Sequence, residues 1–229
     1  MAQNSAQRRS MARTAVVWDA VQGALAPLQG ATVVDIGGGT GGLAVRVAEL
    51  GHRVTVVDPS PDALAILGRR AEESGVADKI TGLQGDLAGL LDLVPEGGAD
   101  VVLCHGVLEI VEPAAALTTL SSVLRPGGIL SLLVNQRHAA VLARAMAGHF
   151  GQAKAMLDSQ EIGPTGRRFT ADEVVSLLDK AGFDAPTLHA VRVFVDLVPS
   201  TLVDLEPGAV TALVELEKAV AGRPEYLPL

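Results

Sequence analysis

Residues 33–44 read Val-Val-Asp-Ile-Gly-Gly-Gly-Thr-Gly-Gly-Leu-Ala, and this stretch decides the fold of the 229-residue chain. Residues 32–36 are mostly β-branched and apolar, which is typical of a strand covered on both faces. Gly37, Gly39 and Gly41 follow, in a turn where backbone can approach a ligand and helix-start N–H groups can face it. We expect a strand, a glycine turn and a helix. The turn either binds a nucleotide or nucleoside, or only packs the helix onto the sheet.

The next expected strand, residues 53–57, supports a bound nucleoside. It ends at Asp58, which lies 21 residues after Gly37. At this spacing a doubly wound fold places a carboxylate on a ribose hydroxyl. The alternative role for Asp58 is to cap the following turn or helix. Dinucleotide folds usually carry Gly-x-Gly-x-x-Gly, whereas this turn reads Asp35-x-Gly37-x-Gly39-x-Gly41.

The rest of the chain alternates apolar strands with amphipathic helices. Helices are expected at residues 11–28, 42–50, 61–74, 87–93, 113–124, 139–156, 171–181 and 208–221. Strands are expected at residues 32–36, 53–57, 80–84, 99–105, 129–134 and 188–195. This order predicts an α/β fold, Rossmann-like and doubly wound, with a mainly parallel sheet of six to seven strands. We expect a single domain over residues 1–229.

Ligands of such sheets bind outside the carboxyl ends of the strands. Gly37, Asp58, Asp86 and His105 all fall at expected strand ends. Two segments are candidates to cover this edge. One is the N-terminal helix at residues 11–28, expected to close over a cofactor. The other is a helical insertion at residues 135–168, expected to act as a lid that recognises an acceptor.

Composition limits the class of protein. Hydrophobic residues make up 48% of the chain but aromatic ones only 3%, so Ala, Val and Leu must build the core. The one cysteine, Cys104, permits no intrachain disulfide and is expected to be a small buried apolar residue. No His and acid cluster has metal-ligand spacing, so we predict no metal. Without a membrane-length apolar run or a signal-peptide core, a cytoplasmic monomer or homodimer is expected, with no membrane partner.

The charge is unevenly distributed. The net charge of −8 argues against a protein coated in basic residues. Residues 1–18 and residues 136–170 nevertheless carry +3 each, which leaves −14 for the remainder. Such local basic segments can bind an anion on an acidic protein, or can simply be solvated.

Beyond these patterns, the glycine turn resembles motif I of the class I S-adenosylmethionine (SAM) methyltransferases. The chain more closely resembles one branch, the bacterial tRNA 5-carboxymethoxyuridine methyltransferase family. The resemblance runs from about residue 12 to the end of the chain. It rests on Arg13-x4-Trp18 and on residues 101–109 (VVLCHGVLE), 123–132 (VLRPGGILSL), 146–150 (MAGHF), 191–194 (VRVF) and 216–226. The family has a further strand after the last of these segments, and residues 221–229 are a candidate to fill part of its place.

The resemblance implies where SAM would lie. The family positions around SAM match Arg13, Gly37, Gly38, Asp58, Leu87, Ala88 and His105. In that family the arginine meets the methionine carboxylate and the acid binds the ribose diol. Strand-end position adds Asp35, Gly39, Pro59 and Asp86 to the expected cofactor site, although Asp86 could instead cap residues 87–93.

The implied reaction is methyl esterification of the carboxymethoxy group on a wobble uridine of tRNA, with S-adenosylhomocysteine as product. A carboxylate acceptor is ionised at neutral pH and needs no general base. A phenol, hydroxyl or amine acceptor would need one, and His105 is then the catalytic candidate. His105 could also contact SAM or be structural. The acceptor-binding candidates are Arg137, His138, Arg144, His149 and Arg192, each of which could instead be a solvated surface residue.

Three functions stay open from sequence. The first is tRNA carboxylate methylation. The second is an O- or N-methyltransferase acting on a small-molecule metabolite, which the net acidity and the Ala-rich insertion favour. The third is a non-catalytic SAM-binding partner protein.

Overall fold

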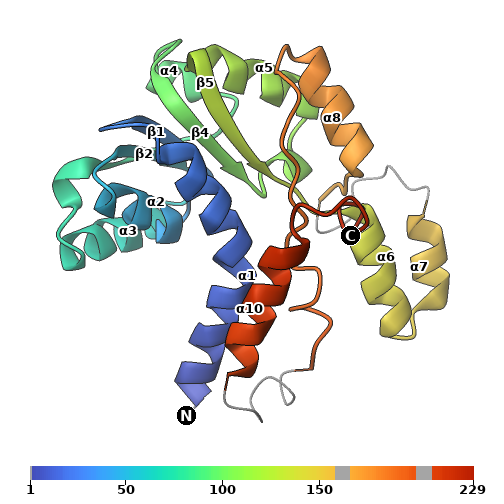
Figure 1. Ribbon diagram of the computed structural model, residues 1–229. Helices are drawn as coiled ribbons and strands as arrows, with labels where there is room; N and C mark the ends of the chain where they lie inside the picture. The colour runs from blue at the N-terminus through green and yellow to red at the C-terminus, as the bar shows by residue number, and fades with distance from the viewer. Residues whose placement is uncertain (1, 158–165, 200–207) are drawn as a thin grey trace.

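The computed structural model describes residues 2–157, 166–199 and 208–229 and has an α/β fold (Figure 1). Within these residues, five parallel strands form one sheet in the order β3-β2-β1-β4-β5. They are β1 (Thr32–Ile36), β2 (Arg53–Asp58), β3 (Ile80–Gln84), β4 (Ala99–His105) and β5 (Leu124–Leu133). The doubly wound parallel sheet was predicted correctly, and β1 lies at its centre.

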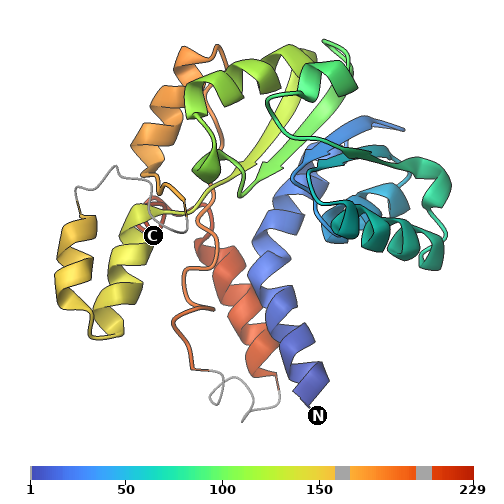
Figure 2. The ribbon, with the colours of Figure 1, turned by 180° about the vertical axis from the view of Figure 1, so that it is seen from behind.

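Helices cover both faces of the sheet (Figures 1 and 2). They are α1 (Ala2–Leu25), α2 (Gly42–Glu49), α3 (Pro61–Glu73), α4 (Leu90–Leu93), α5 (Pro113–Val123), α6 (Arg137–Met146), α7 (Phe150–Met156), α8 (Ala171–Lys180) and α10 (Ala209–Val220), with 3₁₀ turns at Ala77–Lys79 and Leu108–Ile110. Because side chains alternate along β1, Val33 and Val34 belong to different cores. Val33 packs with α2, α3 and the second half of α1, whereas Val34 packs with α4, α5 and α8.

Local sequence explains where two of these helices begin. Ser60 Oγ accepts a hydrogen bond from the Ala63 N–H (3.2 Å), and Pro61 is the first residue of α3. At α8, Thr170 and Glu173 form a reciprocal capping box. These two starts follow the sequence prediction.

The predicted sixth strand is wrong. Residues 188–195 contain no strand, and Arg192 has a left-handed φ of 65°. Buried Glu217 of α10 accepts hydrogen bonds from the N–H groups of Val193, Phe194 and Val195 at 2.7–2.9 Å. One carboxylate therefore accepts the backbone N–H groups that a strand would donate to an adjacent strand. The chain forms a turn at these residues instead. The described part of the sheet stops at five strands, not six to seven.

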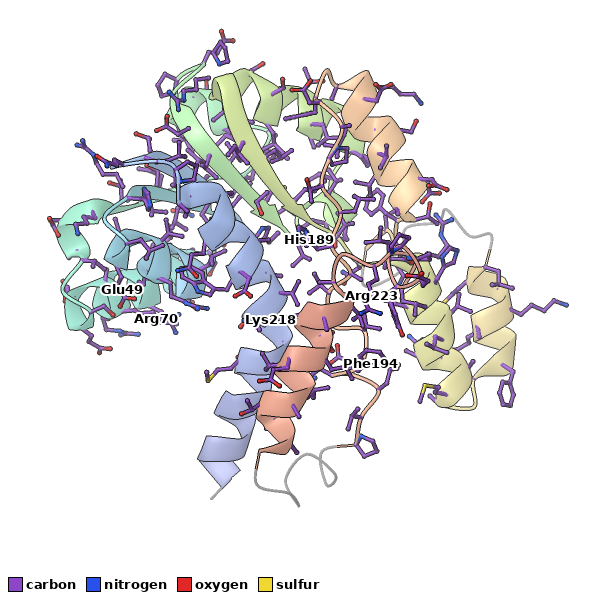
Figure 3. The ribbon with its side chains drawn as sticks, viewed as in Figure 1. Glu49, Arg70, His189, Phe194, Lys218 and Arg223 are labelled. Carbon is purple, nitrogen blue, oxygen red and sulfur yellow. The ribbon has the colours of Figure 1, made fainter. Side chains whose placement is uncertain are left out.

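The C-terminal residues also form no strand. Residues 221–229 consist of turns, so they do not fill the place of a further strand. They pack on the turn that Glu217 holds: the rings of Phe194 and Tyr226 meet edge to face at 5.9 Å (Figure 3 labels Phe194). The segment completes a small apolar cluster beside α10.

Two helix predictions need correction. The single helix expected at residues 139–156 is two helices, α6 and α7, because the chain turns at Gly148 with a φ of 78°. The N-terminal helix, expected at residues 11–28, extends from Ala2 to Leu25. In the described part of the chain, no helix has both the length and the hydrophobicity needed to cross a bilayer.

Candidate functional site

All five strands are parallel, so their carboxyl ends share one edge of the sheet. The glycine turn lies at this edge between β1 and α2, and the Gly37 N–H donates to the Val57 carbonyl (2.8 Å). Asp58 and His105 are the last residues of β2 and β4. Asp86 follows β3 by two residues. The sequence-predicted strand-end residues are therefore brought to one edge.

The glycines of the turn have different reasons to be glycine. Gly37, Gly39 and Gly41 all have positive φ, between 55° and 73°. A Cβ on Gly41 would lie 2.0 Å from Leu67 Cδ1, and one on Gly37 would lie 2.5 Å from Val107 Cγ2. Internal packing therefore explains these two. A Cβ on Gly39 would meet nothing closer than 3.9 Å, so the backbone there borders open space that a ligand could enter.

Asp58 is held rigidly by the turn that it supports. Its Oδ2 accepts the Gly39 N–H and its Oδ1 accepts the Ser60 N–H, both at 2.9 Å. The side chain is only 8% exposed. Each carboxylate oxygen keeps a second acceptor site, so the turn-capping role leaves Asp58 able to accept hydroxyl donors such as a ribose diol.

Asp35 lies beneath the turn. A Cβ on Gly38 would lie 2.5 Å from Asp35 Oδ2, so that glycine leaves the room that the carboxyl group occupies. Burial, together with the nearby negative charge of Asp58, raises the Asp35 pKa to about 7. Asp35 is therefore a buried support of the turn. Its carboxyl group is protonated below about pH 7 and ionised above it.

A cavity of about 350 Å³ opens beside the ends of β2 and β3. It is lined by Pro59, Gln84, Gly85, Asp86, Gly89, Asp92 and Leu93. Asp86 Oδ1 accepts the N–H groups of Ala88 (3.0 Å) and Gly89 (3.1 Å), which is the capping role left open by the sequence. Leu87 is buried, whereas Ala88 is exposed. The volume lies in the range of small-molecule sites.

His105 is a neutral imidazole in this site. Its Nε2 lies 3.0 Å from the hydroxyl of Ser131 on β5. Burial lowers the His105 pKa to about 4. At neutral pH the ring therefore carries no charge and is a weak base, so its contribution is a hydrogen bond. The neighbouring Cys104 is buried, and burial raises its thiol pKa to about 12, so it stays protonated.

Glu109 connects the segments that follow β4 and β5. It is 2% exposed, and its Oε1 accepts the Asn135 N–H (2.7 Å). Its carbonyl accepts the Arg167 N–H (2.8 Å). Among the described residues, Glu109 Oε2 and Arg167 Nε are buried without a hydrogen-bond partner. No sequence pattern marks Glu109 as a buried linking residue, because its burial depends on long-range packing.

Four acceptor candidates lie in or beside α6. Arg137 is buried and its Nη2 contacts both oxygens of Glu173 at 2.7 and 2.8 Å. His138 Nδ1 lies 3.2 Å from the Pro228 carbonyl. Arg144 and His149 are exposed. The structure therefore separates Arg137, which links α6 to α8, from His138, Arg144 and His149, which are all exposed.

Arg13 and Arg192 meet at one carboxylate. Arg13 Nη2 lies 2.8 Å from Asp196 Oδ1, and Arg192 forms an ion pair with Asp196 Oδ2. The sequence had assigned these arginines to different ligands, SAM and the acceptor. Beside the glycine turn, Arg70 of α3 contacts the Thr40 hydroxyl (3.4 Å; Figure 3 labels Arg70). In the described residues, no group of three or more His, Cys, Asp or Glu side chains is arranged to hold a metal ion.

Comparison with known proteins identifies the family. A family model described as a methyltransferase domain matches residues 33–128 of the chain. The tRNA 5-carboxymethoxyuridine methyltransferase of Escherichia coli strain K12 is 32% identical over 225 residues, covering 95% of this chain and 84% of that protein. The chain belongs to this methyltransferase family. It is therefore a SAM-dependent methyltransferase.

More distant similarities agree on the domain. The ubiquinone biosynthesis O-methyltransferase of Xanthomonas euvesicatoria pv. vesicatoria is 36% identical over 124 residues, covering 53% of this chain and 50% of that protein. A putative O-methyltransferase from Nostoc punctiforme has a TM-score of 0.60 at 18% identity, covering 81% of this chain and 56% of that one. The [4+2]-cyclase SpnF has a TM-score of 0.62 at 22% identity, covering 92% and 76%. A cyclase among these neighbours shows that the fold alone does not determine the reaction.

Proposed function

We propose that this methyltransferase esterifies the carboxylate of a carboxymethoxyuridine in tRNA. The observation that carries the proposal is the 32% identity, over 95% of the chain, to the Escherichia coli enzyme of that name. The similarity includes the segments outside the shared methyltransferase domain, since that domain covers only residues 33–128. Those outer segments are where methyltransferases of one fold differ in acceptor.

In this proposal SAM lies along the carboxyl edge of the sheet and supplies an electrophilic methyl group. Asp58 accepts the ribose hydroxyls, and the turn of Gly37, Gly38 and Gly39 borders the methionine part. The adenine is placed beside the cavity that Pro59 and Asp86 line, next to Leu87 and Ala88, which follow Asp86 in the chain. Open space at Gly39 and the free acceptor sites of Asp58 support this placement. Asp35 supports the turn from beneath.

The chain's own residues then need to hold the acceptor in line and exclude water. An uncharged His105 is suited to a carboxylate acceptor, which arrives already ionised and has no proton to lose. With a pKa of about 4, His105 would be a poor base for a hydroxyl or amine acceptor. We assign His105 a positioning role through its hydrogen bond to Ser131.

Arginines at the rim complete the proposed site. Arg13 would exchange Asp196 for the methionine carboxylate, and Arg192 would likewise have to exchange its ion pair with Asp196 to contact an anionic acceptor. Arg144 and His149 are exposed and can contact the acceptor from the insertion, as can His138 at the start of α6. Arg137 is proposed to hold α6 in place rather than to touch the acceptor, because Glu173 occupies its guanidinium.

The second candidate is methylation of a small molecule, which the net charge of −8 favours. The experiment supplies SAM with a labelled methyl group together with two acceptor pools. One is tRNA carrying carboxymethoxyuridine, and the other is a low-mass metabolite extract. Label in tRNA that alkali releases, as it would from an ester, is the expected result. Label only in the low-mass pool would replace the tRNA proposal with the small-molecule one.

A further inference from the structure

The hairpin formed by α6 and α7 differs in charge from the rest of the protein. Residues 137–157 contain Arg137, Arg144 and Lys154, two histidines and no acidic residue. The whole chain has 26 acidic residues and a net charge of −8, so these 21 positions carry +3 and the others −11. The hairpin and the equally basic residues 1–18 therefore attract an anionic ligand more than the acidic remainder of the chain does.

The same hairpin exposes large apolar side chains around its turn. Met146 at the end of α6 is 60% exposed, and Phe150 at the start of α7 is 71% exposed. Of the aromatic residues, all of which lie in the described part of the chain, only Phe150 is exposed. Four of the ten residues of α6 are alanine, and Leu142 and Leu157 are also exposed (36% and 48%). A single exposed aromatic ring is thus set between the exposed side chains of His149 and Lys154.

The hairpin projects from the body of the protein but is anchored at its base. α6 and α7 pack chiefly against each other and extend away from the sheet (Figures 1 and 2). At the base, the Arg137 N–H donates to the Phe169 carbonyl (2.8 Å), and its side chain pairs with Glu173. α6 begins four residues after β5, so the base lies at the carboxyl edge where the acceptor must reach the methyl group.

We propose that the α6–α7 hairpin grips single-stranded RNA, with Phe150 stacking on an unpaired base and Arg144, His149 and Lys154 contacting phosphates. This rests on the proposed tRNA substrate and assigns part of its recognition to one surface. An aromatic ring stacks on any base, and cations beside it follow the backbone. An anionic membrane surface would attract the same cations, so binding to anionic vesicles is the competing outcome of the test. In the described residues, the exposed Arg144 and Lys154 form no ion pair that would compete with phosphate.

The test measures RNA binding directly, without methyl transfer. A fluorescent RNA stem with an unpaired loop is titrated with the full-length protein, and S-adenosylhomocysteine binding is measured in parallel as a check on folding. Phe150→Ala is expected to weaken RNA binding roughly 5- to 150-fold, the range for loss of one stacked base. Phe150→Trp keeps the stack and should restore binding. Leu50→Ala is the matched control, since Leu50 is also an exposed apolar residue (45%) but ends α2 at the opposite edge of the sheet.

Charge is tested by the salt dependence of the same titration. Arg144→Ala and Lys154→Ala should each lower the slope of log K against log salt by about 0.7, the value per contact for single strands. Arg69→Ala, an exposed arginine on α3, should leave the slope unchanged. RNA binding that none of the hairpin variants changes would overturn the proposal but leave the tRNA substrate standing. Binding to anionic vesicles with no binding to RNA, in a protein that still binds S-adenosylhomocysteine, would overturn both.

Discussion

The buried carboxyl group of Asp35 gives the protein a characteristic dependence of stability on pH. Burial and the charge of Asp58 raise its pKa from 3.8 to about 7 in the folded state. The folded protein therefore holds this proton more tightly than the unfolded chain does. Between about pH 4 and pH 7 the folded state binds more protons, so Asp35 makes the free energy of unfolding fall as pH rises. With each tenfold change in proton affinity worth about 1.4 kcal/mol, the whole effect is about 4 kcal/mol.

Asp35→Asn removes this titration while keeping the size of the side chain. We expect the stability of the variant relative to the wild type to increase by about 4 kcal/mol between about pH 4 and pH 8. Urea unfolding of both proteins across this range measures the difference. The variant is compared with the wild type because His105 has the opposite effect on stability. Its lowered pKa makes the free energy of unfolding rise between about pH 4 and pH 6.5 in both proteins, so this contribution cancels in the difference. Asp184→Asn, at an exposed site, should change stability by no more than about 0.5 kcal/mol. An Asp35→Asn difference that is the same at both pH values would refute the account.

Three further predictions follow from single contacts. Glu217→Ala removes the acceptor of three N–H groups, two of them buried, and should lower the free energy of unfolding by at least about 3 kcal/mol in urea titrations; a loss below about 1 kcal/mol would mean that the 193–195 turn does not depend on it. Arg137→Ala removes the ion pair between α6 and α8 but leaves Glu173 its hydrogen bond from the Thr170 N–H, so the free energy of unfolding should fall by about 1–2 kcal/mol in the same assay; a loss below about 0.5 kcal/mol would mean that this link contributes little to stability. Methyl transfer to a carboxylate acceptor should be independent of His105 ionisation, with a kcat that is flat from about pH 6 to pH 8; a tenfold rise per pH unit in that range would point to a base with a higher pKa.

The sequence was sufficient for the part of the fold that local pattern determines. The strand, glycine turn and helix around Gly37 were predicted correctly because the β-branched run, the glycines and the following helical pattern all indicate the same local structure. The prediction of a sixth strand was wrong at Val193 because the apolar pattern of that segment carries no information about Glu217. Glu217 lies more than 20 residues later, on a helix, and accepts the Val193 N–H. The break at Gly148 was missed because a single glycine does not always end a helix.

The site shows the same division. Asp58 and His105 were placed at strand ends by the order of elements alone. Their ionisation and partners were not predictable, since the His105 pKa depends on burial and its hydrogen bond on Ser131 of another strand. Likewise, the joint ion pair of Arg13 and Arg192 with Asp196 needs three-dimensional contact between α1 and the 192–198 turn.

The central claim is that SAM binds at the carboxyl edge with Asp58 on its ribose. Calorimetric titration of the wild type and Asp58→Ala with S-adenosylhomocysteine tests it most directly, because product binding needs no acceptor. We expect the wild type to bind, and the affinity of Asp58→Ala to be weaker by roughly ten- to a hundred-fold or more, because hydrogen bonds to a charged group are lost. Thermal unfolding of both proteins without ligand checks that the variant is folded. A folded Asp58→Ala that binds as tightly as the wild type, or a wild type that does not bind, would contradict the account.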